Sequence, residues 1–471
     1  MRMIQVLGTS SGSGKTTIAM ALCRIFSRKG YRVAPFKAVN MSLNSVIVDG
    51  EYEIARAQWL QAKAAGAVPS RLMNPILLKP EGMGSSQVIF FGKSIGKKTI
   101  EEYYDFIMRE GRKAIREAID ALSEDYDVIV AEGAGSPAEI NLTDRDLANT
   151  YVSSIYGTPS ILVGDIERGG VFASLYGTIS LMPRSDLVKW MVINKMRGDK
   201  SMLYSGIKKI EKITGKKVLG VVPYYEMKLP GEDSFDYQHP RSVDSKIAVV
   251  RYPFMENYSD LDPLIYTDTG YNYLTAENAD DLSDADTIVL PGSKNVFADL
   301  EYMRRAGIDK IIERNVGRAR IIGICGGYQM LGRTITMGDT VVRGLGLLNA
   351  ETHYEDVKTT RSVRFRVRNS IADGSWEEGY EIHYGKVVNT GDEPMNETSY
   401  GVEGNVDPKT MVFGTNIHGI LGSRSIFRLI TGKDIGDPDQ YLISEIDRFA
   451  DIVSASISID DLFKYVEGRQ V

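Results

Sequence analysis

Short apolar runs rich in β-branched residues alternate with longer stretches of helical periodicity through the first half of the chain. The runs MIQVL, YRVAPF, DVIVAE, PSILVGD, WMVINK and KKVLGVVP lie between residue 1 and about residue 222, and helical patterns such as 98–123 and 200–213 separate them. Strands that alternate with helices form parallel sheets with helices on their faces. The first half is therefore predicted to be an α/β domain with a parallel sheet.

A second α/β series begins after a stretch with no period. Residues 223–245 contain three prolines and several acidic residues, which is typical of a linker. The strand-like runs KIAVVRY, DTIVLPGS and RARIIGICGG follow, and then SVRFRVR, YEIHYG and MVFGTNIHG. Beyond about residue 436, apolar residues at helical spacing predict a helical tail on this second domain. We predict domains at 1–232 and 246–471.

Composition narrows the classes of protein that fit. The 471 residues carry 56 Lys and Arg against 62 Asp and Glu, a net charge of −6, which disfavours a nucleic-acid partner. The first residues run from a short apolar stretch into a Gly/Ser turn, unlike a signal peptide, and no apolar run approaches the roughly 18–20 residues that span a bilayer. A cytoplasmic protein without membrane insertion is expected. Two cysteines exclude a disulfide scaffold.

The segment GTSSGSGKTT, residues 8–17, lies between a predicted strand and a predicted helix, as a phosphate-binding loop requires. Backbone N–H groups of such a loop and the helix N-terminus hold phosphate oxygens, the lysine adds a cation and the next hydroxyl can ligate Mg²⁺. A flexible Gly/Ser connector would leave the flanking elements and Lys-Thr-Thr unexplained. We therefore expect a nucleoside triphosphate and Mg²⁺ as ligands. The candidate binding residues are Gly12, Ser13, Gly14, Lys15, Thr16 and Thr17.

Other candidates for the nucleotide site lie at strand ends or in nearby loops. Glu132 follows the strand DVIV, and Asp49 lies in NSVIVDGEY; with Thr16 they are our candidate metal ligands. A solvated loop aspartate explains Asp49 equally well. Lys37 and Lys79 could neutralise charge during phosphoryl transfer, although single lysines are usually surface residues. At the end of WMVI, two residues could contact a purine base or simply form a turn: Asn194 and Lys195.

Cys325 lies in GICGG, between the strand RARII and the helical YQMLG. This is the strand–turn–helix context of a nucleophile elbow, with sulfur in place of the serine oxygen. The alternative is a buried cysteine that only packs, which is our interpretation of Cys23. Of the four histidines, His418 at the end of a strand is the predicted partner of the thiol. The backbone amides of Gly292 and Gly326 are the candidate oxyanion hole.

These segments together resemble the cobyric acid synthase family of glutamine-dependent amidotransferases. GTSSGSGKTT, PFKAVNMSLNS, MNPILLKP, EGAGSPAEINL, GDIERGGVFAS and NKMRGD resemble its synthetase half, which is related to dethiobiotin synthetase. LPGSKN, GICGGYQMLG, GLGLL, GYEIHYG and GTNIHGI resemble its triad-type glutaminase half. The resemblance implies that Cys325 and His418 release ammonia from L-glutamine. It also implies ATP-dependent amidation, through acyl phosphates, of the b, d, e and g carboxylates of adenosylcobyrinic acid a,c-diamide.

One departure from the wider glutaminase pattern concerns the third member of the triad. Many triad-type glutaminases have a glutamate two residues after the histidine, but Ile420 stands there in this chain. The group that orients His418 is left open, as is the oligomeric state. Rival interpretations are a cobyrinic acid a,c-diamide synthase, a partitioning-type switch ATPase and a glutaminase-like binding module. The switch ATPase leaves the cysteine segment unexplained.

Overall fold

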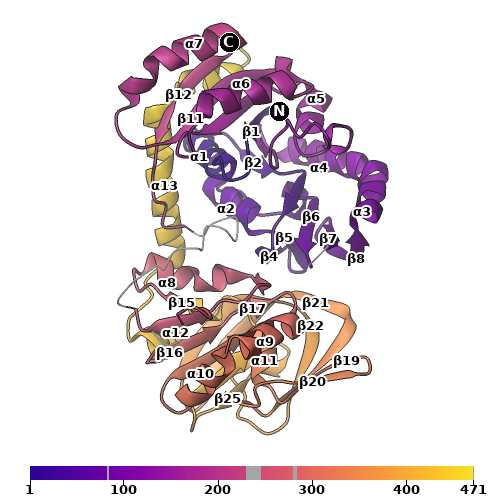
Figure 1. The fold of residues 1–471 in the computed structure, drawn as a ribbon, viewed down its shortest axis with the longest axis vertical. Helices are drawn as coiled ribbons and strands as arrows, with labels where there is room; N and C mark the ends of the chain where they lie inside the picture. The colour runs from indigo at the N-terminus through magenta and orange to yellow at the C-terminus, as the bar shows by residue number, and fades with distance from the viewer. Residues whose placement is uncertain (82–83, 230–244, 279–283, 470–471) are drawn as a thin grey trace. The chain divides into compact units, whose positions relative to one another are not determined.

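The computed structural model describes residues 1–81, 84–229, 245–278 and 284–469, and they form two compact units. The first unit comprises residues 1–42, 53–227 and 442–471, and the second comprises residues 43–52 and 228–441. Most of the predicted linker, 230–244, lies outside the described residues. Figure 1 shows the chain coloured along its length.

A six-stranded parallel sheet forms the centre of the first unit, as the alternating pattern predicts (Figure 1). Its order is β12-β11-β10-β1-β9-β2, so β1 lies in the middle. Most of the strand residues are buried, as expected for a sheet covered on both faces. The strands are β1 (Arg2–Gly8), β2 (Val33–Phe36), β9 (Val128–Glu132), β10 (Ser160–Asp165), β11 (Val188–Met196) and β12 (Lys217–Pro223).

Helices accompany this sheet. The pattern at 98–123 is confirmed as two α-helices joined by a short π-helical turn at Ile107–Gly111, and the pattern at 200–213 as a 3₁₀ turn followed by α7. In α4 the buried residues recur at helical spacing (Ala114, Ile115, Ala118, Ile119 and Leu122), and all but Ala114 join the core of the sheet. The helices are α1 (Lys15–Arg28), α2 (Arg56–Ala65), α3 (Ile100–Phe106), α4 (Arg112–Asp125), α5 (Thr150–Tyr156), α6 (Val171–Leu181) and α7 (Tyr204–Thr214).

The first unit also contains a small mixed sheet that periodicity did not predict, of order β3-β6-β7-β8. Its strands are β3 (Val39–Met41), β6 (Ile76–Pro80), β7 (Ser85–Phe90) and β8 (Lys93–Thr99). Two further short strands, β4 (Ser45–Val48) and β5 (Tyr52–Ala55), follow β3 in the chain. β4 belongs to the second unit although it lies early in the sequence.

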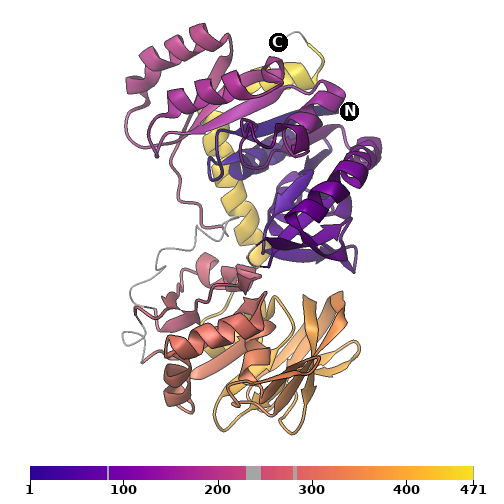
Figure 2. The ribbon, with the colours of Figure 1, turned by 45° about the vertical axis from the view of Figure 1, so that its right-hand side comes forward.

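The helical tail differs from the prediction in what it contacts. Its helices are α13 (Pro438–Ser456) and α14 (Ile459–Val466), and from Leu442 onward they belong to the first unit, not to the second domain as expected (Figure 2). Asp447 pairs with Arg24 of α1 at 2.7 Å, and Phe463 meets Phe26 edge to face at 5.5 Å. Helical spacing in the sequence identifies an apolar face but not the surface that covers it, which explains the error.

The second unit is the predicted second α/β domain. Its main sheet has the order β15-β13-β16-β18-β26-β25, parallel except for the edge strand β25. The strands are β13 (Ile247–Val250), β15 (Asn272–Leu274), β16 (Thr287–Leu290), β18 (Arg320–Ile324), β25 (Asn405–Asp407) and β26 (Val412–Thr415). The helices are α8 (Asp262–Tyr266), α9 (Val296–Arg305), α10 (Ile308–Asn315), α11 (Gly326–Leu331) and α12 (Arg424–Thr431).

A second, mainly antiparallel sheet completes this unit. Two long strands, β21 and β22, pair along most of their length and contain the predicted stretches SVRFRVR and YEIHYG. The strands are β19 (Thr334–Met337), β20 (Thr340–Arg343), β21 (Ala350–Arg368), β22 (Asp373–Asn389), β23 (Asn396–Thr398) and β24 (Gly401–Glu403). β14 (Met255–Glu256) and β17 (Gly292–Ser293) pair as a two-stranded antiparallel ribbon.

No helix in the described ranges is long and apolar enough to cross a membrane.

Candidate active sites

The loop from Gly8 to Gly14 connects the central strand β1 to α1, as predicted. Two glycines are required by its shape. A Cβ at Gly8 would lie 2.3 Å from the Ser13 hydroxyl, and Gly14 has a φ of 96°, which side chains other than glycine rarely adopt. A tight loop between the middle strand of a parallel sheet and a helix N-terminus is the geometry that holds phosphate groups.

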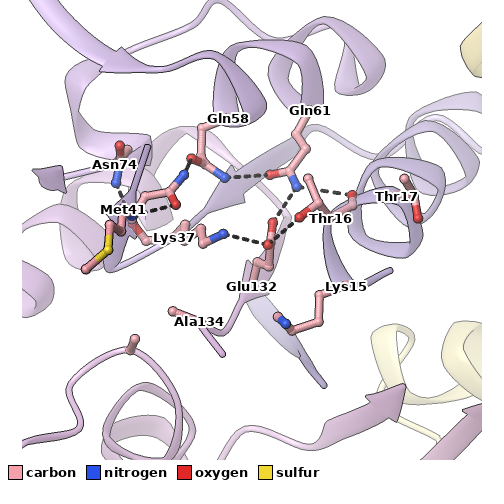
Figure 3. A network of polar contacts seen from close by, with 12 residues as sticks. Lys15, Thr16, Thr17, Lys37, Met41, Gln58, Gln61, Asn74, Glu132 and Ala134 are labelled. Atoms are coloured by element: carbon pink, nitrogen blue, oxygen red, sulfur yellow. Dashed lines mark hydrogen bonds and ion pairs between the residues drawn. The ribbon is translucent and has the colours of Figure 1, made fainter. Parts of the chain in front are cut away.

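Glu132, at the end of β9, is the centre of a buried polar network beside this loop (Figure 3). Its carboxylate accepts hydrogen bonds from the Thr16 hydroxyl and the Gln61 amide and pairs with the Lys37 ammonium, each at 2.7 Å. The structure thus brings three predicted residues together and adds Gln61, which the sequence did not indicate. Lys37 compensates the buried charge of Glu132.

The remaining loop residues are held by local contacts. Lys15 donates to the Ser10 carbonyl at 2.9 Å and Thr17 to the Gly14 carbonyl at 3.0 Å. From the end of β11, Asn194 donates to the Ser13 carbonyl at 3.1 Å. Lys195 reaches the Gly12 carbonyl at 2.7 Å and pairs with Asp165 at 3.1 Å. Asn194 and Lys195 therefore brace the loop, and their contact with a purine base stays a prediction.

Two predicted residues have other surroundings. Lys79 is completely buried in β6 and pairs with Glu53 at 2.9 Å, so the structure gives its charge a partner inside the fold. An assignment of Lys79 to the transferred phosphate is not supported. Asp49 is exposed at the turn after β4, with a φ of 50°, and belongs to the second unit, whereas Thr16 and Glu132 belong to the first. Its role as a metal ligand stays a prediction.

Cys325 occupies a strained turn between β18 and α11. Its φ and ψ are 52° and −109°, an unusual backbone conformation that nucleophile elbows adopt. A Cβ on the next residue, Gly326, would lie 2.6 Å from the Ser293 nitrogen, and one on Gly327 would lie 2.0 Å from the Leu290 carbonyl oxygen. The glycines of GICGG are therefore required for the close approach of neighbouring backbone to the cysteine.

His418 lies beside Cys325, as predicted, and a carboxylate orients it. Its Nδ1 is 2.7 Å from Asp260 Oδ2, and the other oxygen of Asp260 accepts the Gly419 N–H at 2.6 Å. Burial alone would lower the pKa of His418. The negative charges of Asp260 and the Cys325 thiolate outweigh that effect and hold the pKa well above its ordinary value. A protonated His418 next to the thiolate is the form able to give a proton to a leaving amine.

The third partner that the sequence left open is thus Asp260. It lies in the short 3₁₀ turn Tyr258–Leu261, 158 positions before His418 in the chain. No motif links two residues so far apart, because only the fold brings them together. His383, a partly buried histidine of the same unit, has its pKa lowered by burial and bonds its Nδ1 to the Gly385 carbonyl at 2.8 Å, so it is a poorer candidate.

The proposed oxyanion residues lie close to this pair. A Cβ built on Gly292, in β17, would approach the His418 ring to 3.4 Å, and Gly326 begins α11, where the first amides have no acceptor within the helix. Gly292 thus lies near His418, and Gly326 directly follows Cys325; the role of their amides stays a prediction.

We expect replacement of Asp260 by asparagine to impair the release of ammonia from glutamine. The substitution removes the negative charge that raises the pKa of His418, so the imidazolium becomes less stable. By analogy with other triads, the kcat for glutamine hydrolysis should fall by about 10²- to 10⁴-fold. The alkylation of Cys325 by iodoacetamide should also shift to higher pH. Unchanged kcat and alkylation would mean that Asp260 does not act on the pair.

Glu403 lies in β24 and braces the end of β26, which is three residues before His418 in the chain. It accepts the Asn416 N–H at 2.7 Å and the Asn396 amide at 2.9 Å. Burial, reinforced by the charge of Glu381, raises the pKa of Glu403 to about 7. The folded protein therefore binds a proton here that the unfolded chain releases near its ordinary pKa of about 4.3.

This shift predicts how stability depends on pH. Because the folded pKa is raised, the stabilisation is complete below the unfolded pKa and is lost as the pH rises through about 7. In urea unfolding on both sides of that pH, Glu403→Gln should lose less stability with rising pH than the parent protein. Equal losses in the two proteins would refute the assignment.

Two family models match the two halves of the chain. Residues 4–233 match a CobQ/CobB/MinD/ParA nucleotide binding domain, and residues 246–426 match a CobB/CobQ-like glutamine amidotransferase domain. With the phosphate loop in one unit and the cysteine elbow in the other, these matches define a glutamine amidotransferase joined to a nucleotide-binding domain.

Full-length relatives make the assignment more specific. A probable cobyric acid synthase from Thermoplasma acidophilum is 74% identical, over 99% of this chain and all of that protein. The corresponding protein of Picrophilus torridus is 56% identical over 98% of each chain, and a cobyric acid synthase from Thermoanaerobacter sp. is 38% identical over 98% of each. The chain belongs to the cobyric acid synthase family.

Solved structures add nothing to this conclusion. The signal recognition particle receptor FtsY from Elizabethkingia anophelis aligns with 47% of this chain and 56% of its own, at 16% identity and a TM-score of 0.28. That likeness is too low to support an argument.

Proposed function

We propose that the enzyme uses ATP and L-glutamine to amidate the b, d, e and g carboxylates of adenosylcobyrinic acid a,c-diamide. Two observations support the proposal: the group Cys325–His418–Asp260 in one unit, and the phosphate loop with Glu132 in the other. The full-length relatives named as cobyric acid synthases support this choice of substrate. We assign the synthetase reaction to the first unit and the glutaminase reaction to the second, and we propose the cytoplasm as the location.

The glutaminase reaction follows from the residues around Cys325. The thiolate attacks the side-chain carboxamide carbon of glutamine, and the amides of Gly292 and Gly326 stabilise the negative charge that develops on the oxygen. His418 gives its proton to the departing nitrogen, so that ammonia leaves and a thioester forms. His418 then takes a proton from a water molecule as the water oxygen attacks the thioester carbon, and the carbon–sulfur bond breaks to release glutamate and restore the thiolate beside a protonated His418. Asp260 holds the ring in the orientation required for both transfers.

The synthetase reaction follows from the loop residues. The γ-phosphoryl group of ATP passes to a corrin carboxylate, ADP leaves, and ammonia displaces phosphate from the acyl phosphate to give a carboxamide. A free carboxylate is a poor electrophile, so this activation is needed. Lys15 is placed to stabilise the transferred charge. The oxygen atoms of Thr16 and Glu132, 2.7 Å apart, fit Mg²⁺, which would shield the phosphate charges when bound.

Mass spectrometry of the corrin tests the proposal. The purified protein is incubated with MgATP, glutamine and adenosylcobyrinic acid a,c-diamide, and the carboxyl-to-carboxamide steps are followed with time. Stepwise conversion of all the remaining side-chain acids is expected. An unchanged corrin would refute the assignment, and conversion of cobyrinic acid without its first two amides would favour the rival a,c-diamide synthase.

A further inference from the structure

A short segment from the early part of the chain lies against the residues that surround His418. This segment, Leu43–Tyr52, contains β4 and is here named the arm; it belongs to the second unit. β4 contacts both β21 and β22, and the Ser362 N–H donates to the Gly50 carbonyl at 2.8 Å. Val46 and Val48 are buried. The arm is therefore an integral part of the glutaminase unit, although its sequence precedes that unit by about two hundred residues.

Asn257 connects the arm to the His418 ring. The side-chain oxygen of Asn257 accepts the Ser45 N–H at 3.1 Å and the Ser45 hydroxyl at 3.3 Å, and its own N–H donates to the Leu43 carbonyl at 3.3 Å. These bonds leave its Nδ2 3.5 Å from His418 Nε2. Asn257, Ser45 and His418 are all completely buried. The arm thus fixes the amide that faces the reactive nitrogen of the histidine.

Tyr380 provides a second link. Its ring stacks on the His418 ring with centroids 5.1 Å apart and planes 16° apart, and its hydroxyl donates to the Ser45 carbonyl at 3.3 Å. The backbones of Tyr380 and His418 also exchange hydrogen bonds, at 2.8 and 3.3 Å. Ser45 therefore contacts two residues that touch different sides of the same imidazole.

Asn257 and Asp260 act from the same turn. Asn257 precedes the 3₁₀ turn Tyr258–Leu261, and the Asp260 N–H donates to its carbonyl at 3.3 Å. The Asn257 amide faces Nε2 of His418, and the Asp260 carboxylate bonds to Nδ1 of the same ring. Asn257 has a φ of 51°, a left-handed conformation that asparagine tolerates better than most residues. The hydrogen bonds between Asn257 and the arm hold this turn in place, so that Asn257 and Asp260 each lie beside one nitrogen of the His418 ring.

We propose that the arm is a positioning element of the glutaminase site, and that Ser45 acts through Asn257 and Tyr380 to fix the His418 ring. This proposal rests on the proposed function of His418. It means that the end of the synthetase motif PFKAVNMSLNS, together with the residues that follow it, contributes to the release of ammonia. Ser45, Asn257 and Tyr380 are positioning residues, since they act through the histidine.

Three substitutions in the full-length protein test this proposal. Asn257→Gly removes the amide but permits the same backbone conformation. Tyr380→Phe keeps the stacked ring and removes only the hydroxyl bonded to the arm. Ser45→Ala removes one donor to Asn257. Tyr273→Phe is the matched control, because it removes a buried hydroxyl of the same unit whose partner is Tyr271, away from the arm contacts described above.

We expect the kcat for glutamine hydrolysis to fall about tenfold or more in Asn257→Gly and about threefold to tenfold in Tyr380→Phe, with the KM for glutamine within about twofold. Alkylation of Cys325 by iodoacetamide should slow in both variants, because the His418 ring is no longer held beside the sulfur. Amidation with free ammonia should match the control. Ser45→Ala should lower kcat in the parent protein and have no further effect in the Asn257→Gly background, because the two residues act in series.

Several results would overturn the proposal. Parent-like kcat and alkylation profiles in these variants would show that the arm does not position His418. Equal losses of glutamine- and ammonia-dependent amidation, or additive effects of Ser45→Ala and Asn257→Gly, would indicate a purely structural role. Failure of the proposed function is distinguished separately, because His418→Ala would then retain glutamine hydrolysis.

Discussion

Replacement of Cys325 by alanine should abolish amidation with glutamine while amidation with free ammonia continues. In the proposed mechanism the Cys325 sulfur forms the bond to the glutamine carboxamide carbon, and an alanine offers no nucleophile in its place. Loss of a covalent nucleophile should reduce glutamine hydrolysis by at least about 10³-fold. Ammonia is the nitrogen donor of the synthetase reaction, whatever the source of that ammonia. Amidation is measured by mass spectrometry with glutamine or with an ammonium salt.

The control for this variant is Cys23→Ala, which removes the other thiol. Cys23 is buried on α1, and burial raises its pKa far above the ordinary range, so it should remain an unreactive thiol. Cys23→Ala should keep glutamine hydrolysis apart from any loss of stability. If Cys325→Ala loses amidation with both nitrogen sources while it remains folded, the proposed division of labour between the two units is wrong.

Replacement of Lys15 by alanine should impair amidation with either nitrogen source and leave the reactivity of Cys325 unchanged. The Lys15 ammonium lies at the phosphate loop, 2.9 Å from the Ser10 carbonyl oxygen, and we propose that it stabilises charge on the transferred phosphoryl group. We expect amidation to fall by about 10²- to 10³-fold with glutamine and with ammonia alike. The reaction of Cys325 with iodoacetamide should not change, because that chemistry belongs to the other unit.

Lys113→Ala is the matched control, since it removes an exposed lysine on α4. It should keep full activity with both nitrogen sources. If Lys15→Ala lost activity with glutamine but kept it with ammonia, Lys15 would not serve phosphoryl transfer.

Local motifs made both reaction centres predictable from the sequence. The phosphate loop and the cysteine elbow each depend on a strand, a tight turn and a helix that are consecutive in the chain. Glycine at Gly14, Gly326 and Gly327 is required by φ or by close contacts, so the turns leave a clear signal.

Partners that are distant in the chain could not be predicted in the same way. Asp260 meets His418, and Gln61 meets Glu132, only because the fold brings separate elements together. Neither residue belongs to a spacing pattern that a single sequence exhibits. Lys79 illustrates the converse, because a lysine in a motif proves to be a buried ion-pair partner of Glu53.

Two segments belong to a different unit from the sequence around them: the helical tail joins the first unit, and the arm joins the second. Helical spacing identified the tail but not its contacts with α1 and β12. The arm offered no separate signal, because a short strand beside a motif is compatible with either half. Contacts in the folded protein, such as those of Ser45 with Asn257 and Tyr380, make the arm part of the glutaminase unit.

We propose that one chain releases ammonia at Cys325 and uses it at the ATP site, so the amide nitrogen of glutamine should be transferred to the corrin. Glutamine labelled with heavy nitrogen in its side-chain amide is supplied with MgATP and adenosylcobyrinic acid a,c-diamide, and the product is weighed by mass spectrometry. We predict that each new carboxamide carries the label and that Cys325→Ala incorporates none. A corrin amidated without label, or label that persists in the Cys325→Ala product, would contradict the account.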